Sequence, residues 1–264
     1  MKFQEVKPSK ELEQLVVHYW KFEVDNRVPP GQMVEHETLP ESSLSVVFIN
    51  HPGFTGIRLQ GPHQAKFTID IPPESIFIGI KFQPWIQIDS ICADKQELLN
   101  LTSPAPSFLG EEIFPEIDPH SLQIGFSDFD LLEVGLRRLL AGVSITLDPM
   151  VKYLCLSMRM QDKVSIRELV KDVPLSLRPI QKRFKAVTGI SMSEYRNIER
   201  VRNTFISIQA NQGHSIDYIY ENGYYDHAHF INDFKKYMDR PLSDFLKYID
   251  GIELEEHKID AFLQ

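Results

Sequence analysis

The most constraining feature of this sequence is a repeat, in which residues 165–195 recur fifty positions later as residues 215–245. The matching segments are Ser165-Ile166 with Ser215-Ile216, Phe184-Lys185 with Phe234-Lys235, and Ser193-Glu194-Tyr195 with Ser243-Asp244-Phe245. The matches include polar residues suited to helix starts as well as apolar residues suited to a core. They therefore indicate two copies of one structural unit.

Each copy is expected to form a short helix, a tight turn and a longer amphipathic helix. Four polar residues are placed to cap these helices: Ser165, Ser176, Ser215 and Asp226. The turns fall at 172–174 and at Asn222-Gly223, and Gly189 can end the longer helix of the first copy. This arrangement is the helix-turn-helix pattern, whose second helix lies in the major groove of DNA.

The outward faces of the two longer helices carry side chains that can bind DNA. The predicted DNA-contacting residues are, in the first copy, Arg178, Gln181, Lys182, Arg183 and Lys185, and, in the second, His227, Asn232, Lys235 and Lys236. Arginine and glutamine pair with guanine and adenine edges, and lysine neutralises phosphate. Arg178, Gln181 and Lys182 are the preferred base contacts, and we expect the first copy to contribute more binding energy. A single charged helix face is usually just solvated, but two tandem basic units favour DNA.

A longer set of residues follows the order and spacing of a known family. It comprises Phe184-Lys185, Gly189, Ser191, Ser193-Glu194-Tyr195, Ser215-Ile216, Gly223-Tyr224, Asp226, His229-Phe230 and Phe234-Lys235-Lys236-Tyr237. On these residues, 152–249 resemble the DNA-binding domain of the AraC family of bacterial transcription regulators. The chain departs from the family at Asp239, where glycine is usual. Because aspartate accepts left-handed backbone better than most residues, we expect the turn to persist.

The resemblance implies a sequence-specific transcription regulator, not an enzyme, with double-stranded DNA as its partner. RNA polymerase as a further partner and a homodimer are compatible with it. The family places dimer contacts in the helices between the domains, although a plain intramolecular helix pair explains the apolar stripe over 129–140 equally well. A helix over 193–209 should join the two units through the stripe Tyr195, Ile198, Val201, Phe205 and Ile208.

Charge is distributed unevenly along the 264 residues, which are long enough for two domains. The net charge of −9 by itself argues against nucleic acid, but residues 151–250 carry +4 and the remainder −13. A basic half joined to an acidic half is expected when only one domain contacts phosphate. The sequence shows neither a signal peptide nor an apolar run of the roughly 18 residues that span a bilayer. We therefore expect a cytoplasmic protein without membrane contact.

The first hundred residues have the short runs and frequent turns that are typical of a β-structure. Short apolar or alternating runs at 45–49, 56–60, 65–71 and 75–82 lie between turns rich in Gly and Pro. Three segments are similar to the cupin-like sensor domain of many AraC-type proteins: Tyr19-Trp20-Lys21-Phe22, Leu39-Pro40-Glu41 and 79–84. That resemblance implies an unidentified small-molecule effector. The predicted ligand-binding residues are Trp20, Phe77, Phe82 and Trp85, although aromatic residues at strand positions are more often plain core.

No metal site, cofactor or catalytic residue is predicted. His36-Glu37 would need further ligands from other strands, and the available His51 and His63 lie in turns. The sequence contains no phosphate-binding loop, nucleophile elbow or paired-carboxylate motif. Cys92 and Cys155 fall in different predicted domains and are expected to be buried reduced thiols.

The predicted fold class is α+β. We expect a β-rich, barrel-like (cupin-like) domain over 1–105, connecting helices over 106–147, an all-α domain of two helix-turn-helix units over 148–250, and a tail over 251–264. Two other functions stay open: a cupin-like enzyme with a helical tail, and a protein-binding module that has lost DNA binding. A full set of metal ligands would favour the first, and a lack of salt-dependent binding to duplex DNA would favour the second.

Overall fold

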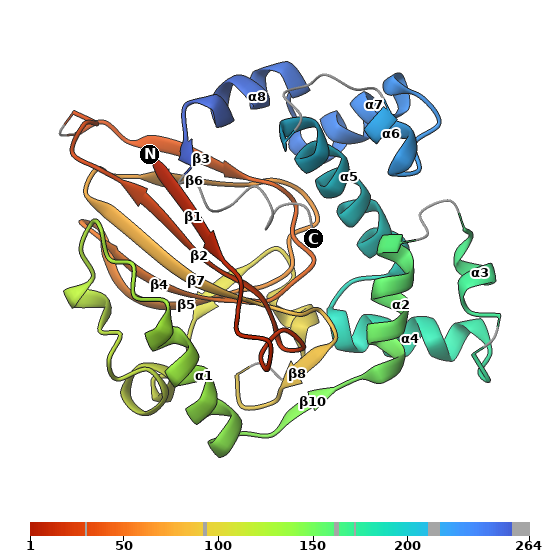
Figure 1. Cartoon of the computed structure of the whole chain (residues 1–264), viewed down its shortest axis with the longest axis horizontal. Coiled ribbons are helices and arrows are strands. Elements are labelled where there is room, and N and C mark those ends of the chain that lie inside the picture. The colour runs from red at the N-terminus through yellow and green to blue at the C-terminus, as the bar shows by residue number, and fades with distance from the viewer. Residues whose placement is uncertain (30, 92–93, 161–163, 172, 211–216, 255–264) are drawn as a thin grey trace.

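Strands fill the first half of the chain and helices the second, and the two halves lie side by side (Figure 1). The computed structural model describes residues 1–264 except 30, 92–93, 161–163, 172, 211–216 and 255–264. Segregated strands and helices define the α+β class, so this prediction is confirmed. Among the described residues, none of the helices combines the length and the apolar character needed to cross a bilayer.

The β-rich half contains a seven-stranded sheet in the order β11-β1-β2-β7-β4-β5-β9. Its strands are β1 (Lys2–Val6), β2 (Val16–Val24), β4 (Ser45–His51), β5 (Phe54–Gln60), β7 (Ser75–Phe82), β9 (Thr102–Pro104) and β11 (Glu253–Leu254). A two-stranded sheet of β3 (Val34–Thr38) and β6 (Phe67–Ile71) lies over one of its faces (Figure 1). A further pair joins β8 (Ile86–Ile88) to β10 (Ile145–Leu147). Because β11 pairs with β1, the chain returns to the β-rich half after the helix that ends at Asp250.

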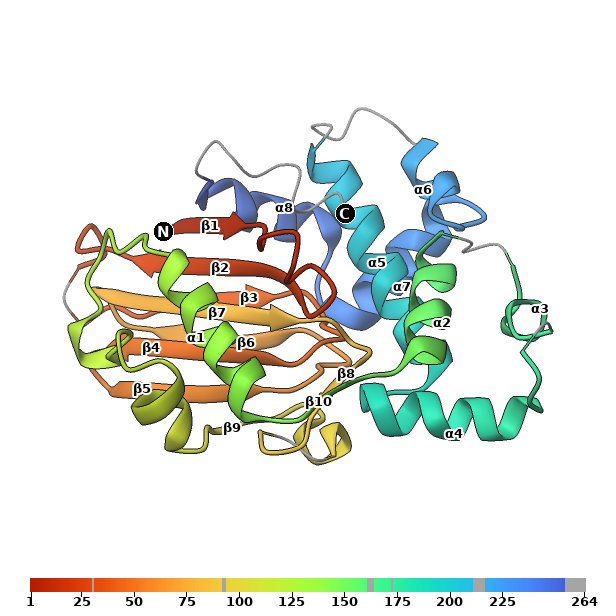
Figure 2. The same ribbon diagram turned by 60° about the horizontal axis from the view of Figure 1, so that its bottom comes forward.

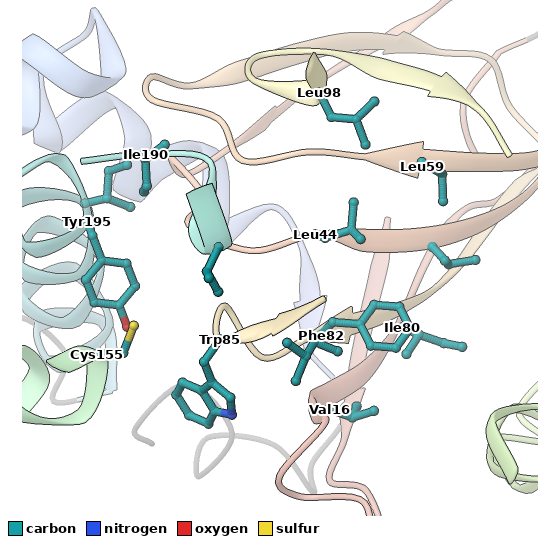
Figure 3. Close-up of a cluster of buried hydrophobic side chains, with 14 of the residues drawn as sticks. Val16, Leu44, Leu59, Ile80, Phe82, Trp85, Leu98, Cys155, Ile190 and Tyr195 are labelled. Carbon is teal, nitrogen blue, oxygen red and sulfur yellow. The ribbon is translucent and has the colours of Figure 1, made fainter. Parts of the chain in front are cut away.

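The burial of β7 shows why this half is layered. All eight residues of β7 are buried, so both faces of the sheet are covered. Because successive side chains of a strand point to opposite faces, Phe77 and Lys81 face the β3–β6 sheet, whereas Ile80 and Phe82 face the other way. Figure 3 shows Ile80 and Phe82 among the apolar side chains of the main core.

The helix α1 (Asp130–Gly142) covers the face of the large sheet opposite β3 and β6 (Figure 2). Glu133 Oε1 in α1 accepts hydrogen bonds from Ser9 N at 2.5 Å and from Tyr19 Oη, on β2, at 3.4 Å. The buried apolar residues of α1 are Leu132, Leu136 and Leu139. The amphipathic helix predicted over 129–140 is therefore present, and its apolar stripe packs within the same chain.

The helical half contains the two predicted helix pairs. It begins with α2 (Pro149–Met160), which is followed by the first pair, α3 (Ile166–Leu169) and α4 (Leu177–Thr188). The helix α5 (Met192–Ala210) joins this pair to the second pair, α6 (Asp217–Glu221) and α7 (His227–Met238). The helix α8 (Leu242–Asp250) follows the second pair (Figure 2). The predicted stripe of α5 is buried along its length: Tyr195, Ile198, Val201, Phe205 and Ile208. The helix pairs thus pack on one central helix.

Local sequence signals define the ends of these helices. Ser165 Oγ accepts a hydrogen bond at 3.2 Å from the backbone three residues on, and Asp226 Oδ1 accepts the equivalent bond at 2.7 Å. Ser176 occupies the cap position of α4 without such a bond, and Ser215 lies outside the described residues. Asp239 takes a left-handed backbone with φ +49°, as expected, and ends α7.

One apolar core extends from the sheet into the helical half. Trp85, which follows β7, is 3% exposed, and in Figure 3 it lies between Phe82 on the sheet and Tyr195 and Cys155 on the helices. Cys155 is a buried free thiol, as predicted, whereas Cys92 lies outside the described residues. The two halves are therefore packed against each other through apolar side chains.

The segment that follows β8 is less helical than its sequence suggests. Leu98, Leu99 and Leu101 predict a short helix over 94–101, but only Lys95–Leu98 form a single 3-10 turn, η1. Asp94 Oδ1 caps this turn by accepting a hydrogen bond from Gln96 N at 2.8 Å, and Asn100, at φ +59°, redirects the chain. The Pro-rich run 102–106, whose composition predicts a break in the chain, begins with β9, which pairs with β5. Two further single-turn elements, Leu109–Ile113 and Pro119–Ser121, precede α1.

Gly189 ends α4 in a conformation that favours glycine. Its φ is +85°, and a Cβ there would lie 3.0 Å from the carbonyl oxygen of Lys95 in η1. Gly189→Ala is therefore expected to lower the free energy of unfolding by about 1–2 kcal/mol. Gly142→Ala is the matched control, because a Cβ on this last residue of α1 would meet nothing within 4 Å, and it should raise stability by up to about 1 kcal/mol. Equal effects of the two variants in urea unfolding would contradict this assignment.

Candidate DNA-contacting surface and internal cavity

The outward face of α4 presents the predicted DNA-contacting residues of the first copy to solvent. The exposed residues are Arg178, Gln181, Lys182, Arg183 and Lys185. Ile180 and Phe184, which alternate with them at helical spacing, are fully buried. Four of the five, together with Gln96 of η1, line one shallow groove: Arg178, Gln181, Lys182 and Lys185. The structure therefore brings these four side chains together on a single surface.

Arg183 is engaged elsewhere. Its Nε donates a hydrogen bond to Asp148 Oδ2 at 2.6 Å, and the Asp148 side chain is 7% exposed. Asp148 Oδ1 also accepts a hydrogen bond from Val151 N at 3.0 Å and so caps α2. In this arrangement Arg183 fixes α4 to the start of α2, and its guanidinium is held away from the groove-lining residues.

The second copy presents a sparser surface. His227, Asn232, Lys235 and Lys236 are exposed on α7. Asp233, which lies between them in sequence, accepts a hydrogen bond from Arg200 Nη2 at 2.9 Å, and the guanidinium of Arg200 lies 4.5 Å from the centre of the Tyr224 ring. The charge of Asp233 is therefore compensated within the protein by the joining helix α5.

A cavity of about 540 Å³ lies between the large sheet and the β3–β6 sheet. Its sheet residues include Trp20, Phe22, Val47, Ile49, Phe77 and Ile69. The helical half closes it with Phe205 of α5, Phe245 and Ile249 of α8, and Ile252. Gly79 makes room for the indole of Trp20, because a Cβ there would lie 2.1 Å from a ring atom. Residues of both halves of the chain thus line one partly open, mainly apolar space.

The four predicted ligand-binding residues do not share this cavity. Trp20 and Phe77 line it, but Phe82 and Trp85 belong to the main core on the opposite side of the sheet. Phe77 and Phe82 differ by an odd number of positions in one strand, so their side chains must point to opposite faces. The grouping of all four around one pocket is therefore corrected to Trp20 and Phe77.

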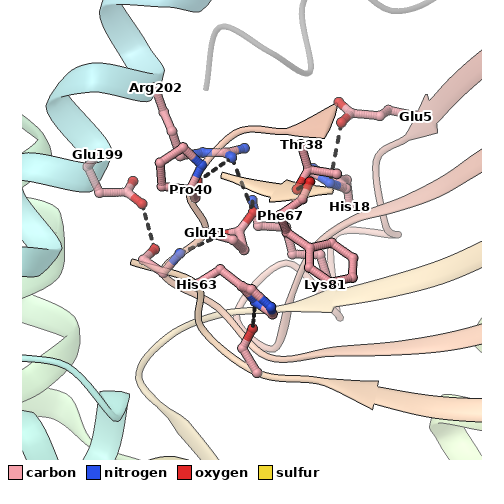
Figure 4. Close-up of polar contacts among 12 residues, drawn as sticks. Glu5, His18, Thr38, Pro40, Glu41, His63, Phe67, Lys81, Glu199 and Arg202 are labelled. Atoms are coloured by element: carbon pink, nitrogen blue, oxygen red, sulfur yellow. Dashed lines mark hydrogen bonds and ion pairs between the residues drawn. The ribbon is translucent and has the colours of Figure 1, made fainter. Parts of the chain in front are cut away.

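Charged side chains gather at the end of the cavity nearest α5 (Figure 4). Glu41 Oε2 lies 2.6 Å from Lys81 Nζ and 3.4 Å from Arg202 Nη1. Burial alone would raise the pKa of Glu41, but Arg202 and Lys81 outweigh it and lower that pKa to about 2. His18 Nε2 lies 3.4 Å from Glu5 Oε1, and burial followed by the charge of Lys81 lowers the pKa of His18 well below its ordinary value. Glu41 is therefore ionised and His18 neutral near pH 7.

A second buried ion pair ties α5 to the rest of the molecule. Arg159 Nε, on α2, donates to Glu199 Oε2 at 2.7 Å, and Ser42 Oγ, in the β-rich half, donates to Glu199 Oε1 at 2.6 Å. Although burial opposes it, the charge of Arg159 lowers the pKa of Glu199. Glu199 thus links three parts of the chain through one carboxylate.

The loop after α7 and the helix α8 contact β3. Glu37 pairs with Lys66 at 2.8 Å and with Arg240, and His36 Nδ1 lies 2.5 Å from Tyr248 Oη. Burial lowers the pKa of His36 to about 4, so the ring is neutral near pH 7. Within the described part of the chain, no three His, Cys, Asp or Glu side chains are grouped as metal ligands.

The charged residues at the end of the cavity nearest α5 were not predicted from the sequence. Glu41, Lys81 and Arg202 come from a loop, a strand and a helix far apart in the chain, and no spacing connects them. Only the alternation of β7 offered a signal, since it places Lys81 on the same face as Phe77.

Comparison with known proteins gives limited matches. The family described as "Domain of unknown function (DUF6597)" matches residues 4–99, within the β-rich half. No curated protein matches the chain. Among solved structures, ToxT from Vibrio cholerae is similar in an apo variant form (16% identity, TM-score 0.47, covering 87% of this chain and 97% of that one). ToxT bound to an unsaturated fatty acid is also similar (17% identity, TM-score 0.46, covering 89% and 96%).

Proposed function

We propose that this chain is a sequence-specific DNA-binding transcription regulator whose DNA affinity responds to a small molecule in the cavity. The observation that carries the proposal is the double role of α5. This helix joins the two helix pairs, and its Arg202 and Phe205 also line the cavity. A ligand there would contact the element that sets the relative position of both pairs.

The DNA-binding part of the proposal rests on the surface of α4 and on the motif order of the repeat. Arg178, Gln181 and Lys182 lie exposed on one groove of the second helix of a helix-turn-helix pattern. The order of motifs over 152–249 resembles the AraC family. We take residues 148–250 as the DNA-binding unit and 1–105 as the effector-binding unit.

The effector part rests on the cavity. Its volume falls within the range of small-molecule sites, about 300–1,000 Å³, and its walls are mainly apolar in area, with a cluster of charged groups at the end nearest α5. Homodimer formation and contact with RNA polymerase stay predictions, as does the assignment to the cytoplasm.

Selection of bound duplexes from a random DNA pool, followed by titration over a salt series, tests the DNA-binding part. We expect a recurrent sequence among the bound duplexes and an association constant that falls linearly with salt concentration on logarithmic axes, because each neutralised phosphate releases counterions. Absence of duplex binding at low salt by the folded full-length protein would contradict the proposal and favour a protein-binding module.

A further inference from the structure

The register of the large sheet gives the cavity a polar end and an apolar end. The row of cavity-facing residues nearest α5 is His18, Lys81, Ser45, Gln60 and Thr102. The row four residues further along consists of Phe3, Phe22, Phe77 and Ile49. The rings of His36 and His51 lie beside Phe22 and Phe77 at this end, and both are uncharged near pH 7 because burial lowers their pKa. At the usual rise of a strand the two rows are roughly 13 Å apart. A ligand that matches this gradient has one polar end and a long apolar body.

The cations at the polar end are already paired. Lys81 and Arg202 share the carboxylate of Glu41, and the side chain of Glu5 lies beside the neutral His18. A charged ligand head would have to lose its hydration without gaining an uncompensated partner, which is unfavourable in a buried site. Within this row of the sheet, the arrangement therefore disfavours both anionic and cationic heads.

Neutral polar groups remain available in the same row. Among the described residues, no side chain or backbone group hydrogen bonds to Ser45 Oγ or to the side-chain amide of Gln60, although both residues line the cavity. A hydroxyl and an amide each donate and accept hydrogen bonds, and so match an alcohol or a carbonyl. Arg58 lies two residues from Gln60 along β5, toward the apolar end, and its guanidinium carbon is 4.0 Å from the centre of the Phe54 ring. It is the group that an anionic ligand would have to use.

We propose that the cavity binds a single-chain amphiphile with an uncharged polar head, such as a fatty alcohol or an ester. The head lies against Ser45 and Gln60, and the chain runs toward Phe22 and Phe77. At about 30 Å³ for each heavy atom, the cavity holds roughly 18 of them. This inference deepens the proposed function, since it names the class of effector for the same cavity.

The test compares decanol, decanoate and decylammonium as probes for full-length protein at neutral pH without DNA. These probes share one chain and differ in head charge. Binding is followed by the change in tryptophan fluorescence, since Trp20 lines the cavity and Trp85 does not, and independently by the thermal midpoint of unfolding. We expect decanol to bind at least tenfold more tightly than either charged probe. Ser45→Ala should weaken decanol binding about three- to tenfold, as expected for one lost hydrogen bond.

The charge argument has its own variant. Glu41→Gln leaves Lys81 and Arg202 without their shared carboxylate, so the affinity for decanoate relative to decanol should rise at least tenfold. Glu116→Gln, which breaks the exposed ion pair with Arg138 outside the cavity, is the matched control and should change neither affinity. Decanoate binding as tightly as decanol in the wild type, or no saturable binding of any probe, overturns the inference. Because the titrations contain no DNA, these outcomes are distinct from a failure of DNA binding.

Discussion

Glu199→Ala is expected to lower the free energy of unfolding by about 3–5 kcal/mol. The substitution removes the carboxylate that pairs with Arg159, whose side chain is 18% exposed, and leaves that guanidinium buried without its partner. It also removes the acceptor of the hydrogen bond from Ser42 and so weakens the contact between the two halves. Equilibrium urea unfolding, followed by circular dichroism, measures the change.

The matched control is Glu116→Ala, which breaks the ion pair with Arg138. Both side chains of that pair are more than a third exposed, so its loss should change stability little. Glu199→Gln should fall between the two, because the amide keeps an acceptor for Ser42 but not the charge. If Glu199→Ala were as mild as Glu116→Ala, the buried pair would not connect α2 and α5 as the structure indicates.

Much of the helical half could be predicted from the sequence because its signals are local. Ser165, Asp226 and Gly189 mark helix ends through bonds or backbone angles within a few residues. The stripe of α5 follows from helical spacing alone. The strands β4, β5, β6 and β7 likewise lie where alternation and turn residues placed them.

The cavity could not be predicted in the same way, because its walls depend on long-range packing. Arg202 meets Glu41 only because α5 lies against the β-rich half, and Tyr248 meets His36 only because α8 returns to β3. Isolated charged residues are usually exposed, so no pattern in the sequence marks these as buried. The engagement of Arg183 by Asp148 is a tertiary contact of the same kind, and helical spacing alone counted Arg183 as free for DNA.

Arg178→Ala is expected to cost about 1–3 kcal/mol of binding free energy at the selected DNA site, a loss of roughly 5- to 150-fold in affinity. Arg178 lies exposed in the groove of α4 beside Gln181 and Lys182, where a guanidinium can pair bidentately with guanine. Binding to random duplexes should fall less, because base contacts carry the sequence information and phosphate contacts do not. Fluorescence anisotropy with both duplexes measures the two losses, and equal losses would show that Arg178 contacts only phosphate.

The corresponding comparison between the two copies uses Lys182→Ala and Asn232→Ala. Lys182 is a cation in the α4 groove, whereas Asn232 is neutral and lies on a surface where Asp233 already engages Arg200. Lys182→Ala should therefore weaken binding more than Asn232→Ala and flatten the salt dependence by about one unit of slope, because one fewer phosphate is neutralised. Asn232→Ala should leave the slope unchanged, since it removes no charge. A larger loss from Asn232→Ala, or an unaltered slope after Lys182→Ala, would place the main DNA contact on α7 instead of α4.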